Sequence, residues 1–267
     1  MKDTKIVFLD LDGTLKDDNK KISDRSIKIM ERLTNKGIQI VLATGRPLPY
    51  TVSLSKQFNI SSYVISSNGA EIYNHIANKV IYNSKISKDD ISRLDVLVKK
   101  YDLYFVVNAL LNSYTNKHFD EPGKKVIESL NDISNETVSQ IIIESYDIEK
   151  MKLFRKEMSS IETLKISNKS RNTNLANQIL FYDITNVNVS KGNAILKLCE
   201  HLNIDMSKTM AVGDSDNDIE MLRAVDVKVA MENSTENLVK VANNTTSSNN
   251  EDGVALILEK LYCEIIK

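Results

Sequence analysis

Short apolar segments alternate with helix-like segments at both ends of this 267-residue chain, and this alternation constrains the fold more than any other feature. Near the N-terminus the apolar segments are KIVFLD, IQIVLATG and YVISSNGA, with helical spacing of apolar residues in ISDRSIKIMERLTNKG between the first two. The order resumes after Val187 with KGNAILKLCEHL, TMAVGDS, NDIEMLRAV and VKVAM. Strands that alternate with helices pair in parallel through right-handed crossovers. The pattern predicts an α/β fold with a doubly wound, mainly parallel sheet.

The middle of the chain has a different pattern, in which predicted strands follow one another in runs. LYFVV, LLNSYTN, SQIIIES, TLKISN and QILFYDIT are strand-like, and only SKDDISRLDVLVKKY and IEKMKLFRKEM read as helices. Such runs indicate a separate α+β unit inserted into the first domain. We therefore predict a core of residues 1–83 and 184–267 and an inserted domain of residues 84–183. Two polar stretches, residues 167–177 and 243–250, read as loops.

Composition and charge exclude several classes of partner. The 35 basic and 36 acidic residues give a net charge of −1, and neither sign forms a long block, so nucleic acid and anionic membranes are not expected to bind. The start of the chain has no apolar segment of signal-peptide length, and no stretch has the roughly 18 uninterrupted apolar residues of a membrane span. We expect a cytoplasmic monomer or homodimer that acts on a small molecule.

Polar residues stand where successive predicted strands end. Asp10 and Asp12 follow the first strand, Thr44 and Gly45 the second, Asn68 the third, and Asp214 a strand near the C-terminus. Ligands of open α/β sheets bind outside the carboxyl ends of the strands. Distant parts of the sequence are therefore predicted to converge on one edge of the sheet.

The segment GDSDND adds Asp214, Asp216 and Asp218 to the two N-terminal aspartates. Two unit charges about 4 Å apart repel by roughly 4 kcal/mol at an effective dielectric constant near 20, so a cluster of carboxylates requires a cation. Carboxylates without clustered cysteine or histidine favour Mg²⁺, which keeps phosphate oxygens and water among its ligands. Lys191 stands at a helix start, which is unfavourable for a cation unless an anion is bound nearby. These residues predict a phosphorylated substrate.

The segments DLDGTL, ATGR, SNGA, VSKG and GDSDND, in this order and with a long insert between the third and the fourth, resemble the haloacid dehalogenase superfamily. More narrowly, the chain resembles the Cof-like phosphatases, which carry a large cap at that point. The resemblance implies a Mg²⁺-dependent phosphatase that hydrolyses small phosphorylated metabolites, such as sugar phosphates, through an aspartyl phosphate.

The same resemblance implies roles for individual residues. Asp10 is the nucleophile, Asp12 the general acid/base, Thr44 a donor to the phosphate, and Lys191 the cation that steadies Asp10 and the phosphate. The implied metal ligands are Asp10, the main-chain carbonyl of Asp12, Asp214 and Asp218, with Asp218 either a direct ligand or an orienting group. The remaining residues expected to bind phosphate or substrate are Leu11, Gly45, Arg46, Asn68 and Asn217. A structural ion pair is the alternative for Arg46.

Two other functions use similar residues. A phosphomutase would pass the same aspartyl phosphate back to a sugar, and the sequence does not separate it from a phosphatase. A phosphorelay receiver also has clustered aspartates, a threonine and a lysine, but the spacing of Asp10 and Asp12 after one strand and the long insert argue against it. One departure from the Cof-like pattern is Glu232, which stands before Asn233 where that branch usually has glycine.

Overall fold

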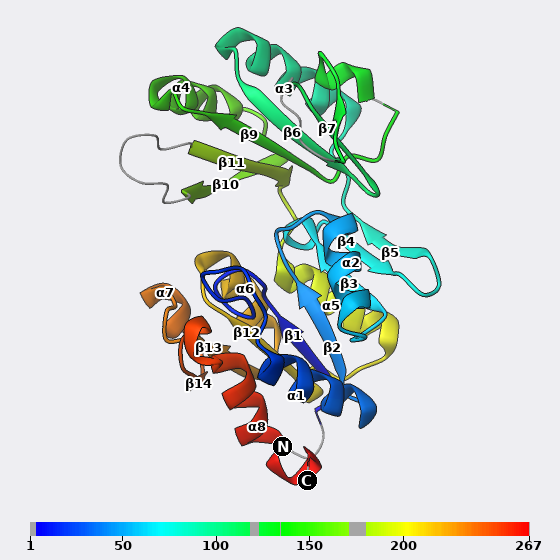
Figure 1. Ribbon diagram of the computed structural model, residues 1–267. Helices are drawn as coiled ribbons and strands as arrows, with labels where there is room; N and C mark the ends of the chain where they lie inside the picture. The colour runs from blue at the N-terminus through cyan, green and yellow to red at the C-terminus, as the bar shows by residue number, and fades with distance from the viewer. Residues whose placement is uncertain (1–3, 118–122, 134, 171–179, 267) are drawn as a thin grey trace. The chain divides into compact units, whose positions relative to one another are not determined.

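The computed structural model describes residues 4–117, 123–133, 135–170 and 180–266. The chain forms two compact units (Figure 1): a core unit of Met1–Tyr82 and Ser190–Lys267, and an inserted unit of Asn83–Val189. Each unit has hydrophobic clusters of its own.

The core unit is built on a sheet with the strand order β14-β13-β12-β1-β2-β3-β4-β5. The pairs from β14 through β3 are parallel, and β4 joins β3 antiparallel. The strands are β1 (Ile6–Leu9), β2 (Gln39–Ala43), β3 (Tyr63–Ser66), β4 (Glu71–Asn74), β5 (Lys79–Asn83), β12 (Thr209–Gly213), β13 (Val227–Ala230) and β14 (Asn244–Thr245). The helices of this unit are α1 (Asp24–Asn35), α2 (Leu48–Gln57), α5 (Lys191–Leu202), α6 (Ile219–Ala224), α7 (Glu236–Val239) and α8 (Gly253–Ile266), with short 3₁₀ turns at η1 (Ser67–Gly69), η3 (Met206–Lys208), η4 (Asp216–Asp218) and η5 (Asn249–Glu251).

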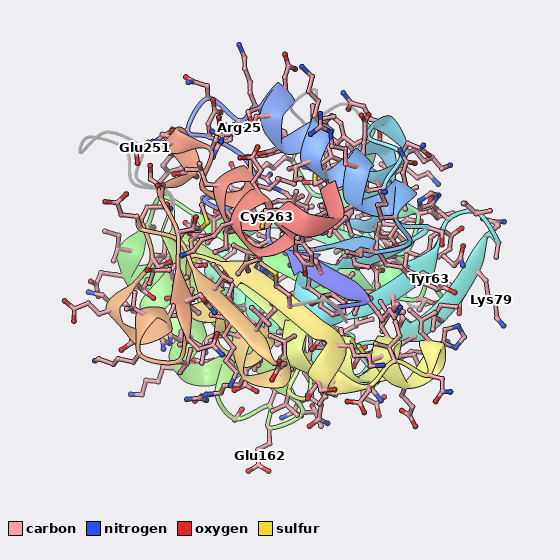
Figure 2. The ribbon with its side chains drawn as sticks, turned by 90° about the horizontal axis from the view of Figure 1, so that it is seen from below. Arg25, Tyr63, Lys79, Glu162, Glu251 and Cys263 are labelled. Atoms are coloured by element: carbon pink, nitrogen blue, oxygen red, sulfur yellow. The ribbon has the colours of Figure 1, made fainter. Side chains whose placement is uncertain are left out.

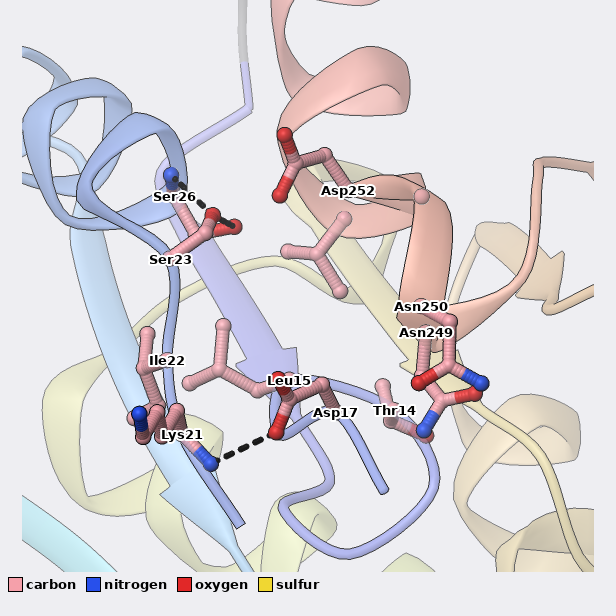
Figure 3. Close-up of a pocket in the computed structure, with 12 residues that line it drawn as sticks. Thr14, Leu15, Asp17, Lys21, Ile22, Ser23, Ser26, Asn249, Asn250 and Asp252 are labelled. Atoms are coloured by element: carbon pink, nitrogen blue, oxygen red, sulfur yellow. Dashed lines mark hydrogen bonds between the residues drawn. The ribbon is translucent and has the colours of Figure 1, made fainter. Parts of the chain in front are cut away.

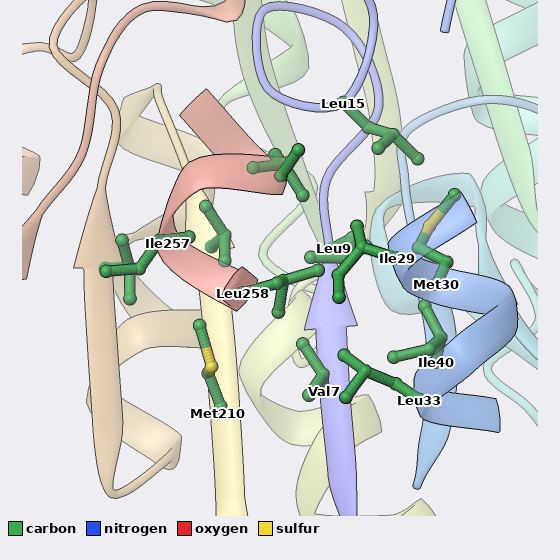
Figure 4. Packing of buried hydrophobic residues seen from close by; sticks show 14 of the residues in the cluster. Val7, Leu9, Leu15, Ile29, Met30, Leu33, Ile40, Met210, Ile257 and Leu258 are labelled. Atoms are coloured by element: carbon green, nitrogen blue, oxygen red, sulfur yellow. The ribbon is translucent and has the colours of Figure 1, made fainter. Parts of the chain in front are cut away.

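Helices cover both faces of this sheet, which explains why β1 is apolar throughout. Successive side chains of a strand point to opposite faces. Val7 and Leu9 accordingly pack in one cluster with residues of α1 and α8 (Figure 4), whereas Ile6 and Phe8 pack in another with residues of α5 and α6. Figure 2 shows α1 and α8 on the same side of the sheet, where an ion pair joins Arg25 to Glu259 at 2.6 Å.

The segment YVISSNGA, predicted as one strand, is interrupted in the structure. β3 ends at Ser66, and Ser67, Asn68 and Gly69 have φ angles of 49°, 58° and 99°. Three successive residues in the left-handed region cannot continue an extended strand. The chain therefore turns back, and β4 pairs with β3 from the other direction.

The inserted unit has a sheet with the order β10-β11-β9-β6-β7-β8, in which every pair is antiparallel except β7 with β8. Two helices pack on this sheet through a shared apolar cluster. The elements are α3 (Lys88–Tyr101), β6 (Tyr104–Ala109), β7 (Asn112–Thr115), β8 (Lys125–Val126), η2 (Leu130–Ile133), β9 (Gln140–Ser145), α4 (Ile148–Met158), β10 (Leu164–Ser170) and β11 (Leu180–Asn186).

The predicted fold class, a mainly parallel α/β core with an inserted α+β domain, is confirmed. The expected boundary between residues 183 and 184 differs from the one in the structure, because residues 183 and 184 both lie inside β11. This strand pairs with β10 as far as Asn186, so the inserted unit extends to Val189. In the two predicted loops, residues 167–170 continue β10, residues 171–177 lie outside the described residues, and β14 lies within 243–250. No helix among the described residues is long and apolar enough to cross a membrane.

Candidate active site

The structure brings the predicted site residues to the carboxyl edge of the core sheet. Asp10 follows β1, Thr44 follows β2, Asn68 follows β3 and Asp214 follows β12. Because these strands are parallel neighbours, their carboxyl ends lie together. Lys191, at the first position of α5, reaches the same edge through its side chain.

Backbone hydrogen bonds fix the loops after β2 and β3 to one another. The Asn68 N–H donates to the Thr44 carbonyl at 3.0 Å, and the Ser67 N–H donates to the Arg46 carbonyl at 2.9 Å. The Asn217 amide donates to the Asn68 side-chain oxygen at 3.3 Å, which ties in the loop after β12. Segments from three parts of the sequence are therefore held in fixed register at this edge.

Lys191 lies at the centre of the site with a side chain that is fully buried. Its ammonium donates to Asp10 and, at 2.6 Å, to Asp218. Burial alone would lower the pKa of Lys191, but the charges of the two carboxylates and their hydrogen bonds raise it above its ordinary value. The lysine is therefore a permanent cation in the site and not the surface lysine that composition alone would suggest.

Three carboxylates surround one point. Asp10, Asp214 and Asp218 each place an oxygen within 4.8 Å of the others. Burial, together with the charges of Asp10 and Asp218, raises the pKa of Asp214 to about 7. With all three ionised, the charge of Lys191 leaves a surplus of two negative charges, which one divalent cation would balance. The available ligand atoms are carboxylate oxygens, and this set fits a hard cation such as Mg²⁺.

Two glycines allow these carboxylates to approach the backbone. Gly13 has φ +89°, and a Cβ there would fall on the Asp214 carboxylate. A Cβ on Gly213 would lie 2.7 Å from the Asp218 side chain. The hydroxyl of Thr14 donates to Asp214 at 2.8 Å, so the loop after β1 also orients the carboxylate from the loop after β12. Thr14 was not among the predicted site residues, because its contact with Asp214 depends on the path of the loop after β1.

Asp12 lies at the open side of the site and is paired with Arg46. The guanidinium donates through Nε to Oδ2 at 2.8 Å and through Nη2 to Oδ1 at 2.7 Å. Burial would raise the pKa of Asp12, but the hydrogen bonds and charge of Arg46, with the charges of Lys20 and Lys16, hold it below its ordinary value. In this structure Arg46 therefore adopts the ion-pair role that the sequence left as its alternative.

The structure does not bring every predicted side chain to the site. The Leu11 side chain is buried in the apolar cluster beneath the loop, so only its backbone is available to a ligand. Gly45 lies between Thr44 and Arg46 in the loop after β2, where the Arg46 N–H donates to the Thr44 hydroxyl at 3.1 Å.

Two asparagines that the sequence analysis did not assign to the site support the loop after β1. The Asn233 amide donates to the Gly13 carbonyl at 2.8 Å and its oxygen accepts from the Asn249 N–H at 3.0 Å. The Asn249 amide donates to the Lys16 carbonyl at 2.9 Å. Glu232 is exposed beside Asn233 and does not prevent this contact. The segments AMENS and NNEDGVA, which contain the two asparagines, were the available signal.

A cavity of about 220 Å³ lies behind the same loop (Figure 3). Its lining includes Thr14, Leu15, Asp17, Asn249 and Asn250, and it lacks Asp10, Asp12 and Lys191. The cavity is therefore not lined by the candidate catalytic side chains.

Comparison with known proteins gives one consistent family. Residues 7–258 match the model of the haloacid dehalogenase-like hydrolases. A 5-amino-6-(5-phospho-D-ribitylamino)uracil phosphatase from Bacillus subtilis is 29% identical, and the match covers 95% of this chain and 94% of the relative. A subclass IIB sugar phosphatase of known structure is 26% identical with a TM-score of 0.79, over 97% of this chain and 99% of that one. A haloacid dehalogenase-like hydrolase from Bacteroides thetaiotaomicron has the same fold, with a TM-score of 0.85 at 24% identity, over 97% and 99% of the two chains.

Proposed function

Because the chain belongs to the haloacid dehalogenase-like hydrolases and is a phosphoric monoester hydrolase, we propose that it hydrolyses small phosphorylated metabolites through a phosphoaspartate on Asp10 and depends on Mg²⁺. The observation that carries the proposal is the buried contact of Asp10 with Lys191, inside a group of three carboxylates and two residues from Asp12. A buried carboxylate beside a fixed cation suits a nucleophile that must approach an anion.

In the first step, an Asp10 oxygen attacks phosphorus and the bond from phosphorus to the leaving oxygen breaks. Lys191 offsets part of the repulsion between the carboxylate and the phosphate, because its ammonium touches Asp10. Asp12 donates a proton to the leaving oxygen. In the second step, Asp12 accepts a proton from the water that attacks the phosphoaspartate, and Asp10 is regenerated.

Asp12 can carry out the first of these proton transfers only in its protonated form. The bidentate pair with Arg46 stabilises the ionised form instead. We therefore propose that the pair opens when substrate binds and that Arg46 turns toward an anionic group of the substrate. This movement would free Asp12 for the leaving oxygen.

The proposed metal ligands are Asp10, Asp214, Asp218 and the main-chain carbonyl of Asp12. When bound, Mg²⁺ supplies charge that stabilises the phosphoryl group during transfer. Asp218 also accepts hydrogen bonds from the backbone N–H groups of Asp214 and Ser215 at 3.1 and 3.2 Å, which orients its carboxylate within the loop after β12. Thr44, Asn68, Asn217 and the backbone of Leu11 and Gly45 are the proposed phosphate contacts.

The substrate class rests on two relatives. One is named as a phosphatase of a phosphorylated ribitylaminouracil and the other as a sugar phosphatase. We propose phosphorylated polyols and sugars as the first compounds to test. A phosphomutase would use the same aspartate and return the phosphoryl group to a second hydroxyl.

The test is a phosphate-release assay on a panel of phosphorylated sugars and polyols. We expect sustained release of inorganic phosphate with Mg²⁺ and none with excess chelator. Isomerised sugar phosphate without free phosphate would instead identify a phosphomutase. The absence of both products across the panel would contradict the proposed function.

A further inference from the structure

Three cations gather around Asp12 in the core unit. Arg46 forms the bidentate pair described above, and the Lys20 ammonium lies 3.9 Å from Asp12 Oδ1. Lys16 donates to the hydroxyl of Tyr50, and its ammonium lies 4.8 Å from the centre of that ring. The guanidinium of Arg46 lies 5.7 Å from the centre of the same ring. Both cations therefore lie close to the Tyr50 ring. We call this group of Lys16, Lys20, Arg46 and Tyr50 the cationic cluster.

Lys16 is the cation of this cluster that no carboxylate of the described residues contacts. Among the described residues, Asp12 is the one carboxylate within ion-pair distance of Lys20 or Arg46, and none lies within that distance of Lys16. Asp18, in the same loop, interacts with Lys20 at longer range and accepts hydrogen bonds from Asn249 and Asn250. Lys16 is only 6% exposed, yet its hydrogen-bond partner is a neutral hydroxyl. The charge of Asp12 acts on Lys16 without a direct contact, and an ammonium removed from water in this way is stabilised further by an anion that binds beside it.

The fold holds Lys16 beside Asp12. The Lys16 N–H donates to the Leu11 carbonyl at 2.8 Å, and residues 12 and 16 face one another as an isolated β-bridge. Asn249 holds the Lys16 carbonyl from the other side. Lys20 and Arg46 have side chains that are 63% and 34% exposed, so the cluster is open to a ligand within this unit.

We propose that the cationic cluster is a subsite for a second phosphate group of the substrate, which makes the preferred substrates bisphosphorylated small metabolites. The proposal rests on the proposed phosphatase function. Asp12 is assigned to the leaving oxygen, so a cluster around Asp12 faces the part of the substrate that leaves. Arg46 offers a planar pair of donors, Lys16 and Lys20 offer ammonium groups, and Tyr50 adds a hydroxyl, which together match the oxygens of a phosphate.

The test compares two substrates that differ by one phosphate, fructose 6-phosphate and fructose 1,6-bisphosphate. We expect the wild type to have a kcat/KM at least about tenfold higher for the bisphosphate, the size of one favourable charge pair. Lys16→Met keeps the apolar stem and removes the charge, and it should reduce this ratio by about tenfold. Lys28→Met, an exposed lysine on α1, is the matched control and should keep the wild-type ratio. Lys20→Met provides a second, exposed position and should lower the ratio less.

Equilibrium binding of both compounds to the wild type and to Lys16→Met gives a readout that does not need turnover. Weaker binding of the bisphosphate alone in the variant would support the subsite. A bisphosphate preference that is absent, or that Lys16→Met leaves unchanged, would overturn the proposed subsite while phosphate release still supports the proposed function.

A Lys16-dependent preference for 3-phosphoglycerate over glycerol 3-phosphate, without one for the bisphosphate, would overturn the assignment to phosphate in favour of a carboxylate. Failure to release phosphate from any compound, with selective bisphosphate binding intact, would instead count against the phosphatase and leave the subsite standing.

Discussion

Each unit of the molecule buries carboxylates, but it stabilises them differently. In the inserted unit, Asp95 accepts hydrogen bonds from the Ser129 hydroxyl and the Leu130 N–H, both at 2.8 Å, and forms an ion pair with Lys99 at 2.7 Å. Burial would raise the pKa of Asp95, but these partners hold it below its ordinary value. In the core unit, the pKa of Asp214 is instead raised to about 7 by burial and by neighbouring carboxylates.

We propose that this difference separates a structural carboxylate, Asp95, from a functional one, Asp214. The hydrogen-bond donors and the cation that stabilise the Asp95 carboxylate all belong to the inserted unit. This carboxylate therefore needs no bound ligand. Asp214 shares one point with two further carboxylates and a single lysine, and a bound cation would relieve the repulsion among the three carboxylates. Perturbed pKa values at such clusters are typical of functional sites. We expect the two kinds of carboxylate to respond differently to substitution, metal and pH.

The largest effect is expected from Asp10→Asn. An amide is a poor nucleophile, so kcat should fall by at least about a thousandfold. Asp95→Asn, the same change in the inserted unit, should retain most of the activity. Phosphate-release rates of the two purified variants measure the contrast, and comparable losses in both would show that the effect is structural.

Asp214→Asn should weaken the response to Mg²⁺. A neutral amide is a poorer ligand for a hard cation, so the Mg²⁺ concentration for half-maximal rate should rise by at least about tenfold. Titration of the rate with Mg²⁺ gives this value for the wild type, for Asp214→Asn and for Asp95→Asn. An unchanged midpoint in Asp214→Asn would remove Asp214 from the proposed ligand set.

The two carboxylates should have opposite effects on stability as pH changes. The folded pKa of Asp214 is raised, so the folded protein holds this proton more tightly than the unfolded chain does. Its contribution to stability is present below the unfolded value near 3.8 and is lost as pH rises toward 7. Without metal, the wild type should therefore lose stability relative to Asp214→Asn between pH 5 and pH 8, and Mg²⁺ should restore it. Denaturant unfolding at both pH values checks this, and parallel pH dependence in the two proteins would disprove the raised pKa.

The smallest effect on activity is expected from Asp95→Asn, which should act on stability. The change removes a charge that Lys99 and two further donors satisfy, at a cost of about 1–2 kcal/mol in the free energy of unfolding. Because the pKa of Asp95 is lowered on folding, the advantage of the wild type should begin to decrease as pH falls below about 4 and be lost below the folded pKa. Urea unfolding at pH 7 and pH 3.5 measures both values, and an equal difference at the two would contradict the assignment.

The sequence predicted most of the core because that region obeys local rules. Apolar runs marked β1, β2 and β12, and polar residues at their ends predicted the convergence of Asp10, Thr44 and Asp214. Lys191 was also predicted, since a lysine at a helix start requires an anion. Parallel topology brings such positions together whatever their distance in the sequence.

The sequence did not predict features that depend on the path of the backbone. Lys16 approaches Asp12 because its N–H turns back to the Leu11 carbonyl, and Tyr50 reaches Lys16 from the first turn of α2. The boundary near residue 183 was misplaced because the length over which β11 pairs is not visible in its own residues. These contacts join segments whose local patterns carry no information about one another.

The most direct test of the central claim is to trap phosphate on Asp10. Asp12→Asn, incubated with Mg²⁺ and ³²P-labelled p-nitrophenyl phosphate and quenched in acid, should accumulate label, because this leaving group needs no proton whereas attack by water needs a base. We expect the label on the peptide that contains Asp10, sensitive to hydroxylamine, and absent when Asp10 is also changed to Asn. Turnover of the substrate with no labelled protein, or with label on any other residue, would contradict the account.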